Sequence, residues 1–136
     1  LQAAVLLVKL RYLDTWNCQR RDRAAYYTRR LGELDEVGVP VERPGNHHTY
    51  HQYVIRLPRR DAAVKLLHSR GIGCAIFYPV PLHCQACFAY LGCRADDCPR
   101  AREASREVLA LPIYPELTPE QQDAVVEAIK AHLAAG

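Results

Sequence analysis

Residues 71–83 read GIGCAIFYPVPLH and hold the side chains best placed for chemistry. The first glycine is expected to end a helix in the left-handed conformation, with an extended apolar run after it. Pro79 and Pro81 each bias the preceding residue towards extended backbone. Tyr78 and His83 are therefore expected on a stiff connection at the end of a strand, where a phenol and an imidazole can hydrogen-bond a ligand. The alternative is a buried strand followed by an ordinary loop.

Four cysteines follow this segment, at Cys84, Cys87, Cys93 and Cys98. Cys84 and Cys87 have the spacing of a zinc-binding pair, and His83 lies beside them. However, Cys93 and Cys98 are too widely spaced to form a second tight pair. Cysteine also packs as a small buried hydrophobic residue. Structural or free thiols are therefore favoured over zinc, and no metal site is assigned.

The other candidate residues give weaker signals. His48 and His51 point to opposite faces of a strand, so one metal ion cannot easily bind both. The lysines, at Lys9, Lys65 and Lys130, fall on expected helices, with no setting that favours Schiff-base chemistry. We find no glycine-rich phosphate loop and no metalloprotease or serine-hydrolase motif. From these residues alone the sequence does not name a reaction.

Composition limits the class of protein. The chain has 136 residues, 49% of them apolar and 24% charged, as expected for one globular domain. Its net charge of +3 is too small to indicate a nucleic-acid partner. Its apolar runs fall short of the roughly 18 residues that a membrane span needs. With no secretory signal, a cytoplasmic location and reduced cysteines are expected. Because the sequence contains no methionine and begins within an apparent helix, we expect a piece of a longer protein.

The first element predicted from the apolar spacing is one long helix over residues 1–34, followed by a connection over 37–45. At about 1.5 Å per residue this helix would run roughly 50 Å, a length typical of helices that join two domains. A strand is expected over residues 50–57, with Tyr53, Ile55 and Leu57 sharing one face.

A helix over residues 61–68, capped by Asp61, and a strand over 73–78 should come next. A strand, a helix and another strand together predict a βαβ-like or split α/β unit, so the fold class is α/β. Thr118 should cap the last helix, with Gln121 reaching back to it. Two further helices are expected before it, over residues 82–91 and 100–110.

Four blocks match a known family in order and spacing. The first block is LQAAVL at the start, with KL and WN after it, and it matches a helix that follows the cofactor region. The second block is YHQYVIR at 50–56, and it matches a strand. Residues 71–83 match the signature GIGT-x-x-HYP-x-PLH, and LALPIYPELT at 109–118 matches LSLPMYPELT. The whole pattern resembles the DegT/DnrJ/StrS type of sugar aminotransferase.

The resemblance implies a fold-type-I homodimer that depends on pyridoxal 5'-phosphate. Such enzymes transfer an amino group, typically from glutamate, to a nucleotide-linked ketosugar. The resemblance makes residues 1–136 the C-terminal small domain, with an interdomain-type helix over 1–34 and an α/β body over 35–136. The Schiff-base lysine and the other cofactor-binding groups would precede Leu1, in a large domain that binds the cofactor. The chain alone is then expected to be inactive, with no catalytic or cofactor-binding residue of its own.

The resemblance also places the segment around Tyr78 at the mouth of the cofactor site. Tyr78, His83 and Phe77 are the expected substrate-binding residues. The family usually has histidine where this chain has Phe77, so the resemblance does not determine which sugar is accepted. The cysteines replace positions that are normally apolar or small, which favours packing over zinc. Two alternatives stay open: a free-standing domain that docks on a partner through its first helix, and a zinc-stabilised module.

Overall fold

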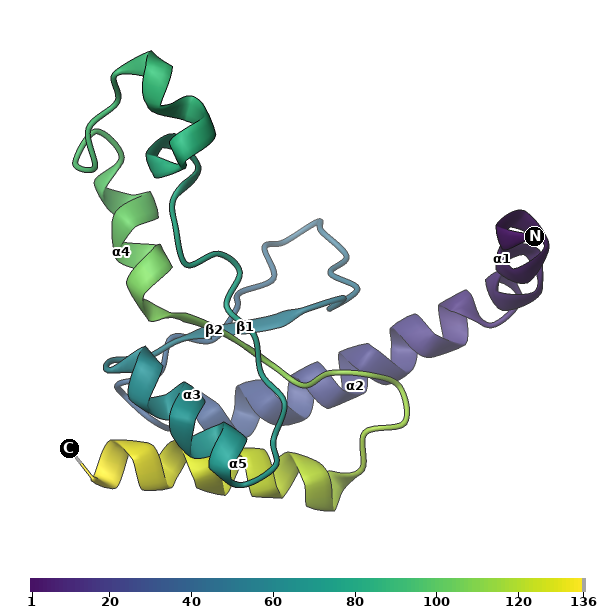
Figure 1. The fold of residues 1–136 in the computed structure, drawn as a ribbon. Coiled ribbons are helices and arrows are strands. Elements are labelled where there is room, and N and C mark those ends of the chain that lie inside the picture. The colour runs from purple at the N-terminus through teal and green to yellow at the C-terminus, as the bar shows by residue number, and fades with distance from the viewer. Residues whose placement is uncertain (136) are drawn as a thin grey trace.

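The computed structural model describes residues 1–135 and is a mixed helical domain around a small antiparallel sheet (Figure 1). Strand β1 (Tyr53–Arg56) pairs with β2 (Val108–Leu111), and Tyr53 lies opposite Leu111. The helices are α1 (Gln2–Leu10), α2 (Leu13–Leu31), α3 (Arg60–Ser69), α4 (Pro99–Glu107) and α5 (Pro119–Ala134). Two short 3-10 helices, Leu82–Cys84 and Ala86–Leu91, precede α4.

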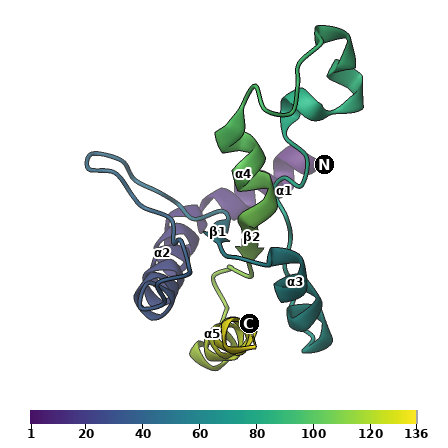
Figure 2. The same cartoon turned by 90° about the vertical axis from the view of Figure 1, so that its left-hand side faces the viewer.

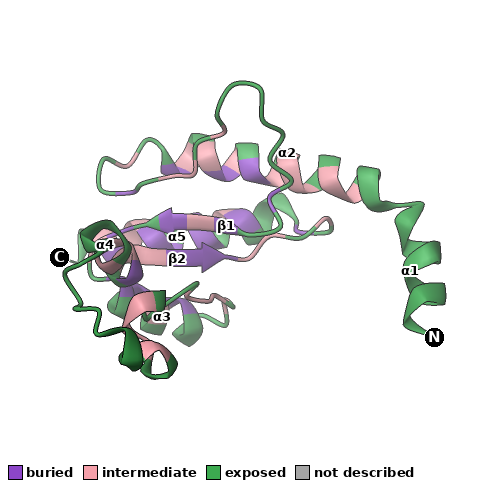
Figure 3. Cartoon of the chain, turned by 90° about the horizontal axis from the view of Figure 1, so that it is seen from above, coloured by how far each residue is buried: buried purple, intermediate pink, exposed green. Residues whose placement is uncertain are grey.

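The core lies between the sheet and three helices. Helix α5 packs against both α2 and α3 below the strands (Figures 2 and 3). Its Val125, Val126 and Ile129 belong to the same buried cluster as Tyr27 and Leu31 of α2. Burying these large apolar side chains is the main source of stability for the domain. Within residues 1–135, no helix is both long and apolar enough to cross a membrane.

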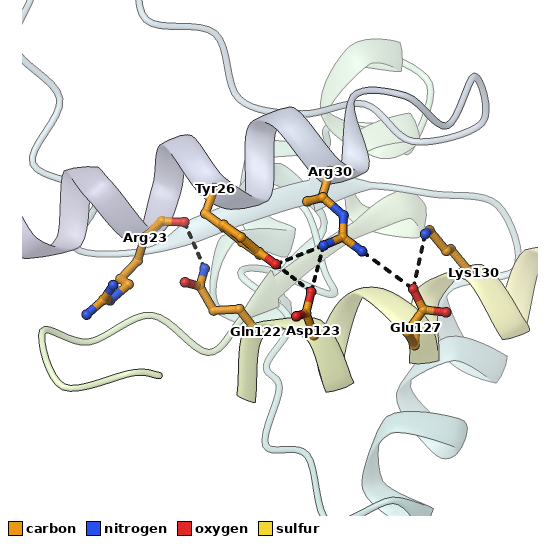
Figure 4. Close-up of polar contacts among 7 residues, drawn as sticks. All are labelled: Arg23, Tyr26, Arg30, Gln122, Asp123, Glu127 and Lys130. Carbon is orange, nitrogen blue, oxygen red and sulfur yellow. Dashed lines mark hydrogen bonds and ion pairs between the residues drawn. The ribbon is translucent and has the colours of Figure 1, made fainter. Parts of the chain in front are cut away.

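A polar network on the outside holds α2 against α5 (Figure 4). The Tyr26 hydroxyl and the Arg30 guanidinium both donate to Asp123, at 2.5 and 2.7 Å. The hydroxyl first, and Arg30 after it, lower the pKa of the Asp123 carboxyl. Beside it, the buried Gln122 amide donates to the carbonyl of Arg23 at 2.9 Å. These contacts fix the position of α5 along α2.

The predicted 1–34 helix is wrong as one element, because the chain bends between α1 and α2. A turn at Arg11 and Tyr12 replaces the helical pattern, and the Tyr12 amide donates to the Lys9 carbonyl at 3.0 Å. The Tyr12 ring stacks on Trp16 at 5.8 Å, and the Lys9 amine lies 5.9 Å from the centre of the same indole. These side-chain contacts bridge the bend without proline or glycine, so apolar spacing does not reveal it. Every residue of α1 is exposed (Figure 3).

The second predicted strand, over 73–78, is also wrong. Only Ala75 pairs there, in an isolated bridge with Ala110, and the partner of β1 is β2. The predicted helix over 100–110 ends at Glu107, and the apolar run after it is the missed strand. Because Leu109, Ala110 and Leu111 are all buried, that run shows no alternation, and a buried strand then looks like a buried helix. The βαβ-like unit is therefore replaced by an antiparallel pair.

Several local predictions are confirmed. Tyr53, Ile55 and Leu57 share the buried face of the first strand, which is shorter than the predicted 50–57. Thr118 and Gln121 form the reciprocal cap at the start of α5. Helix α3 covers the predicted 61–68 but begins at Arg60, so Asp61 lies in its first turn and does not cap it. Gly71 has a φ of +71°, the left-handed conformation expected after that helix. The predicted 82–91 helix is instead the two 3-10 helices, separated at Gln85.

Candidate functional site

Phe77 and Tyr78 lie where the chain leaves the body after its bridge to β2. The backbone of Ala75 exchanges hydrogen bonds with Ala110, at 3.1 and 2.8 Å, and so fixes the start of this segment on the sheet. Two residues later Phe77 is 38% exposed, and Tyr78 is 71% exposed. A phenol with that exposure can still hydrogen-bond an incoming ligand.

A groove of about 590 Å³ runs between this segment and α4. One wall is formed by large, mostly apolar side chains between Phe77 and Gln85. The other wall consists of small or β-branched residues of α4 and the start of β2: Ala101, Ala104, Ser105 and Val108. Phe77 and Tyr78 therefore share one concave surface, as expected for residues that bind the same ligand.

His83 is placed differently from these two residues. It lies half-buried in the first 3-10 helix, and its Nε2 is 3.4 Å from the carbonyl oxygen of Ala95. That contact turns the imidazole towards the loop before α4, whereas Phe77 and Tyr78 line the groove. The structure thus brings two of the three predicted residues together.

Two side chains that the sequence pattern does not connect with Phe77 lie near it, His51 and Cys74. A second hollow, of about 410 Å³, lies on the other side of Phe77 and includes His51 and Cys74. The Cys74 sulfur is 3.5 Å from His68 Nε2, and burial raises the pKa of this thiol. His51 was considered only as a metal ligand, and Cys74 only as part of an apolar run, so neither was predicted to lie beside Phe77.

Arg60 is the residue that fixes the far wall of the groove. Its guanidinium is buried, at 6% exposure, and donates to the carbonyls of Val108 at 2.8 Å and Ser105 at 3.1 Å. A third bond goes to the Asp61 carboxylate at 2.6 Å. Ser105 and Val108 are both groove residues, so Arg60 holds the junction of α4 and β2 at the groove. Sequence gave no signal for this role, because an arginine at a helix start is ordinarily solvated.

Residues 41–50 form an arm that projects from the body (Figure 2). The Arg21 guanidinium on α2 donates to both oxygens of the Glu42 carboxylate, at 2.8 and 3.1 Å, and to the His48 carbonyl at 2.6 Å. The His48 amide in turn donates to Glu42 at 2.8 Å. The bond from Arg21, followed by that from His48, lowers the pKa of Glu42 to about 2. The base of the arm is therefore held by a charge-assisted cluster.

We expect Glu42 to make the stability of the domain depend on pH. Its pKa is about 2 in the folded chain, against 4.5 ordinarily, so its contribution is complete above pH 4.5 and is lost as the pH falls towards 2. Glu42→Gln should make the stability less dependent on pH below pH 4.5, because an amide cannot titrate. Urea denaturation midpoints at pH 6 and pH 3 measure the difference. Glu36→Gln, at an exposed glutamate, is the matched control and should leave the profile unchanged. Equal profiles for Glu42→Gln and the unsubstituted chain would contradict this.

The described residues supply neither a metal cluster nor a lysine suited to hold pyridoxal phosphate. Among residues 1–135, no group of three or more histidine, cysteine or acidic side chains is arranged to hold a metal ion. Lys9 and Lys65 are exposed on helices, and the Lys130 amine pairs with Glu127 at 3.1 Å. The two hollows beside Phe77 are lined by other residue types. Among the described residues, no lysine therefore lies where either hollow could hold the cofactor.

Comparison with known proteins gives the family to which this fold belongs. The model of the DegT/DnrJ/EryC1/StrS aminotransferase family matches residues 1–130. The chain belongs to this family. A pleiotropic regulatory protein of Geobacillus stearothermophilus is 48% identical over 131 residues, which are 95% of this chain and 35% of that protein.

Two further comparisons agree. The dTDP-3-amino-3,4,6-trideoxy-alpha-D-glucose transaminase of Streptomyces venezuelae is 38% identical over 130 residues, 96% of this chain and 34% of that protein. The crystal structure of S. venezuelae DesV in complex with a ketimine intermediate superposes with a TM-score of 0.91 at 38% identity, covering 96% of this chain and 35% of that one. The chain thus spans about a third of the length of the relatives it matches.

Proposed function

We propose that this chain is the small domain of a pyridoxal-phosphate-dependent aminotransferase that moves an amino group from glutamate to a nucleotide-linked ketosugar. The observation that carries the proposal is the family match over residues 1–130, supported by a backbone similar to that of S. venezuelae DesV at a TM-score of 0.91. The working enzyme would be a cytoplasmic homodimer. Its large domain would lie in the part of the relatives' length that this chain does not span.

Within that enzyme the cofactor, when bound by the large domain, supplies the electron sink for amino transfer. This chain's residues would bind and orient the sugar. The exposed Tyr78 hydroxyl can donate a hydrogen bond to an oxygen of the substrate's sugar or phosphate. The substrate would then lie at the groove that Tyr78 lines. Phe77 places an apolar ring where the family signature has a histidine, so it would select among sugars by packing. His83 would contact the substrate only at the rim of the groove, because its imidazole contacts the Ala95 carbonyl.

Helix α1 is the surface we assign to the large domain. An apolar hollow of about 670 Å³ runs along α1 onto the start of α2, with Leu6, Leu10, Leu13 and Trp16 among its residues. A contiguous apolar patch exposed on a protein surface often marks a contact with another protein. The same feature supports the second candidate, a domain that docks on a separate partner, and the two differ in whether the partner belongs to the same polypeptide.

Substitutions in the full-length enzyme test the role of Tyr78 and His83. Tyr78→Phe should lower turnover of the sugar substrate by about tenfold, the effect of losing one hydrogen bond to a ligand, and His83→Ala should lower it by less, because the imidazole contacts Ala95. Conversion of the cofactor to its aminated form by glutamate should stay near its original rate, because these residues would touch the sugar only. Stopped-flow absorbance of the cofactor separates the two half-reactions.

Tyr90→Phe is the matched control, since Tyr90 is 79% exposed on the nearby 3-10 helix and lies outside the groove lining. It should leave both half-reactions unchanged. If both half-reactions fall together in Tyr78→Phe, the residue has a structural role. If neither changes, Tyr78 does not bind the sugar.

A further inference from the structure

Four of the six cysteines lie in one loop, residues 82–98, which we name the cysteine loop. It leaves the body after Tyr78, forms the two 3-10 helices and returns at the start of α4 (Figure 1). The other two cysteines, Cys18 on α2 and Cys74 beside His68, lie outside it. The loop therefore concentrates thiols at one place next to the groove.

The thiols in this loop are free and accessible. Cys87, Cys93 and Cys98 are exposed, and Cys84 is half-buried. Accessibility is the first requirement for reaction with a small oxidant. Cys74, by contrast, is partly buried, and burial raises the pKa of its thiol, which disfavours the reactive thiolate.

The path of the loop brings its outgoing and returning halves together. His83, next to Cys84, contacts the carbonyl of Ala95, which lies between Cys93 and Cys98. The two 3-10 helices contact each other, and within residues 1–135 neither has comparable contact with another helix or strand. A segment with so few contacts to the body rearranges at low cost, so its halves can close the remaining distance between thiols.

The thiols are not arranged as a ready metal site. A structural zinc ion needs four ligands in a tetrahedron. Among residues 1–135, the side chains of the loop do not gather three histidine, cysteine or acidic ligands around one point. The four thiols are free, and oxidation is one reaction open to them.

We propose that the cysteine loop is a site of reversible thiol oxidation, in which one thiol of Cys84 or Cys87 joins one of Cys93 or Cys98. With hydrogen peroxide as oxidant, a thiol loses its proton, and the thiolate sulfur attacks one peroxide oxygen and breaks the O–O bond. The sulfur becomes a sulfenic acid, and the expelled hydroxide takes up the thiol's proton and leaves as water. The second thiol attacks that sulfur, forms the S–S bond and displaces a second water. Two sulfurs are oxidised, one peroxide is reduced, and a dithiol reductant reverses the change.

The disulfide would act on the groove through shared residues. Leu82 and Gln85 belong both to the loop and to the groove wall. A bond across the loop restricts how far these side chains move relative to Ala101 on α4. The proposal does not depend on the proposed function, because it concerns the thiols of this chain alone.

The test treats the purified chain with one equivalent of hydrogen peroxide and counts free thiols in denaturant with a chromogenic disulfide. Two of the six thiols should be lost, and dithiothreitol should restore them. Mass spectrometry of unreduced peptides should show a link between the two halves of the loop within one chain. Circular dichroism before and after treatment checks that each protein is folded.

Paired variants keep the result decisive. Cys84→Ser with Cys87→Ser, and separately Cys93→Ser with Cys98→Ser, should each abolish the cross-loop link. The control, Cys18→Ser with Cys74→Ser, should lose two thiols as the unsubstituted chain does. A link through Cys18 between two chains, a Cys84–Cys87 link, or sulfinic acid without a disulfide would overturn the proposal. So would protection of all four loop thiols by one equivalent of zinc.

Discussion

Replacing Arg60 with methionine should lower the free energy of unfolding by about 3 kcal/mol, because two charge-assisted hydrogen bonds inside the domain are lost together. The guanidinium donates to the Val108 and Ser105 carbonyls at the junction of α4 and β2. Methionine keeps most of the apolar stem of the side chain, so the loss reports on the guanidinium. Both carbonyls lose this partner, and the bond to Ser105 is buried, so that carbonyl is left with its desolvation cost.

Urea denaturation measures this effect, with Arg70→Met as the control. Arg70 lies just after α3 and is exposed, so its replacement should cost less than about 0.5 kcal/mol. Arg60→Lys should fall between the two, since an ammonium keeps the charge but lacks the planar fork. A loss below about 1 kcal/mol for Arg60→Met would show that the desolvation of this charge cancels its hydrogen bonds.

Treatment of this chain with pyridoxal phosphate, followed by borohydride, should leave no stoichiometric adduct on any single lysine. A lasting Schiff base needs an amine beside groups that hold the phosphate and the ring. Lys9 and Lys65 are exposed, and Lys130 is paired with Glu127. None lines a hollow beside Phe77. Scattered substoichiometric labelling is the expected result, and the chain should not transaminate by itself.

Peptide mapping by mass spectrometry measures the occupancy of each lysine. Lys65→Arg is a suitable control, because removing one exposed lysine should leave labelling at the other two unchanged. One equivalent of adduct at a single position would mean that this chain holds the cofactor itself. The division of labour between two domains would then be wrong.

Features set by neighbouring residues could be predicted from the sequence. The reciprocal cap between Thr118 and Gln121 and the left-handed Gly71 depend on only a few residues, and both are confirmed. The face shared by Tyr53 and Ile55 follows from strand alternation, and it is confirmed as well. The four short sequence blocks between residues 1 and 118 also depend on neighbouring residues, and the family that they indicate is confirmed by the match over residues 1–130.

Features set by distant contacts could not be predicted. The run at Val108–Leu111 is buried throughout, so its sequence pattern does not distinguish strand from helix. The bend between α1 and α2 was missed for a different reason: Tyr12 stacks on Trp16 only four residues away, and apolar periodicity does not register such a contact. The position of His83 does depend on more distant contacts. Phe77 and Tyr78 share the groove, whereas His83 turns towards Ala95, a contact decided by how the loop folds back.

The antiparallel pairing of β1 with β2 has a consequence for synthesis on the ribosome. Tyr53 lies opposite Leu111, so α3, the cysteine loop and α4 must all be made before the sheet can form. Closing so long a loop costs chain entropy that only later contacts repay, and such high contact order slows folding. The side chains of Tyr27 and Leu31 also wait for α5, which comes last. The nascent domain therefore stays open until its final helix leaves the exit tunnel, and its apolar α2 face is exposed to chaperones until then.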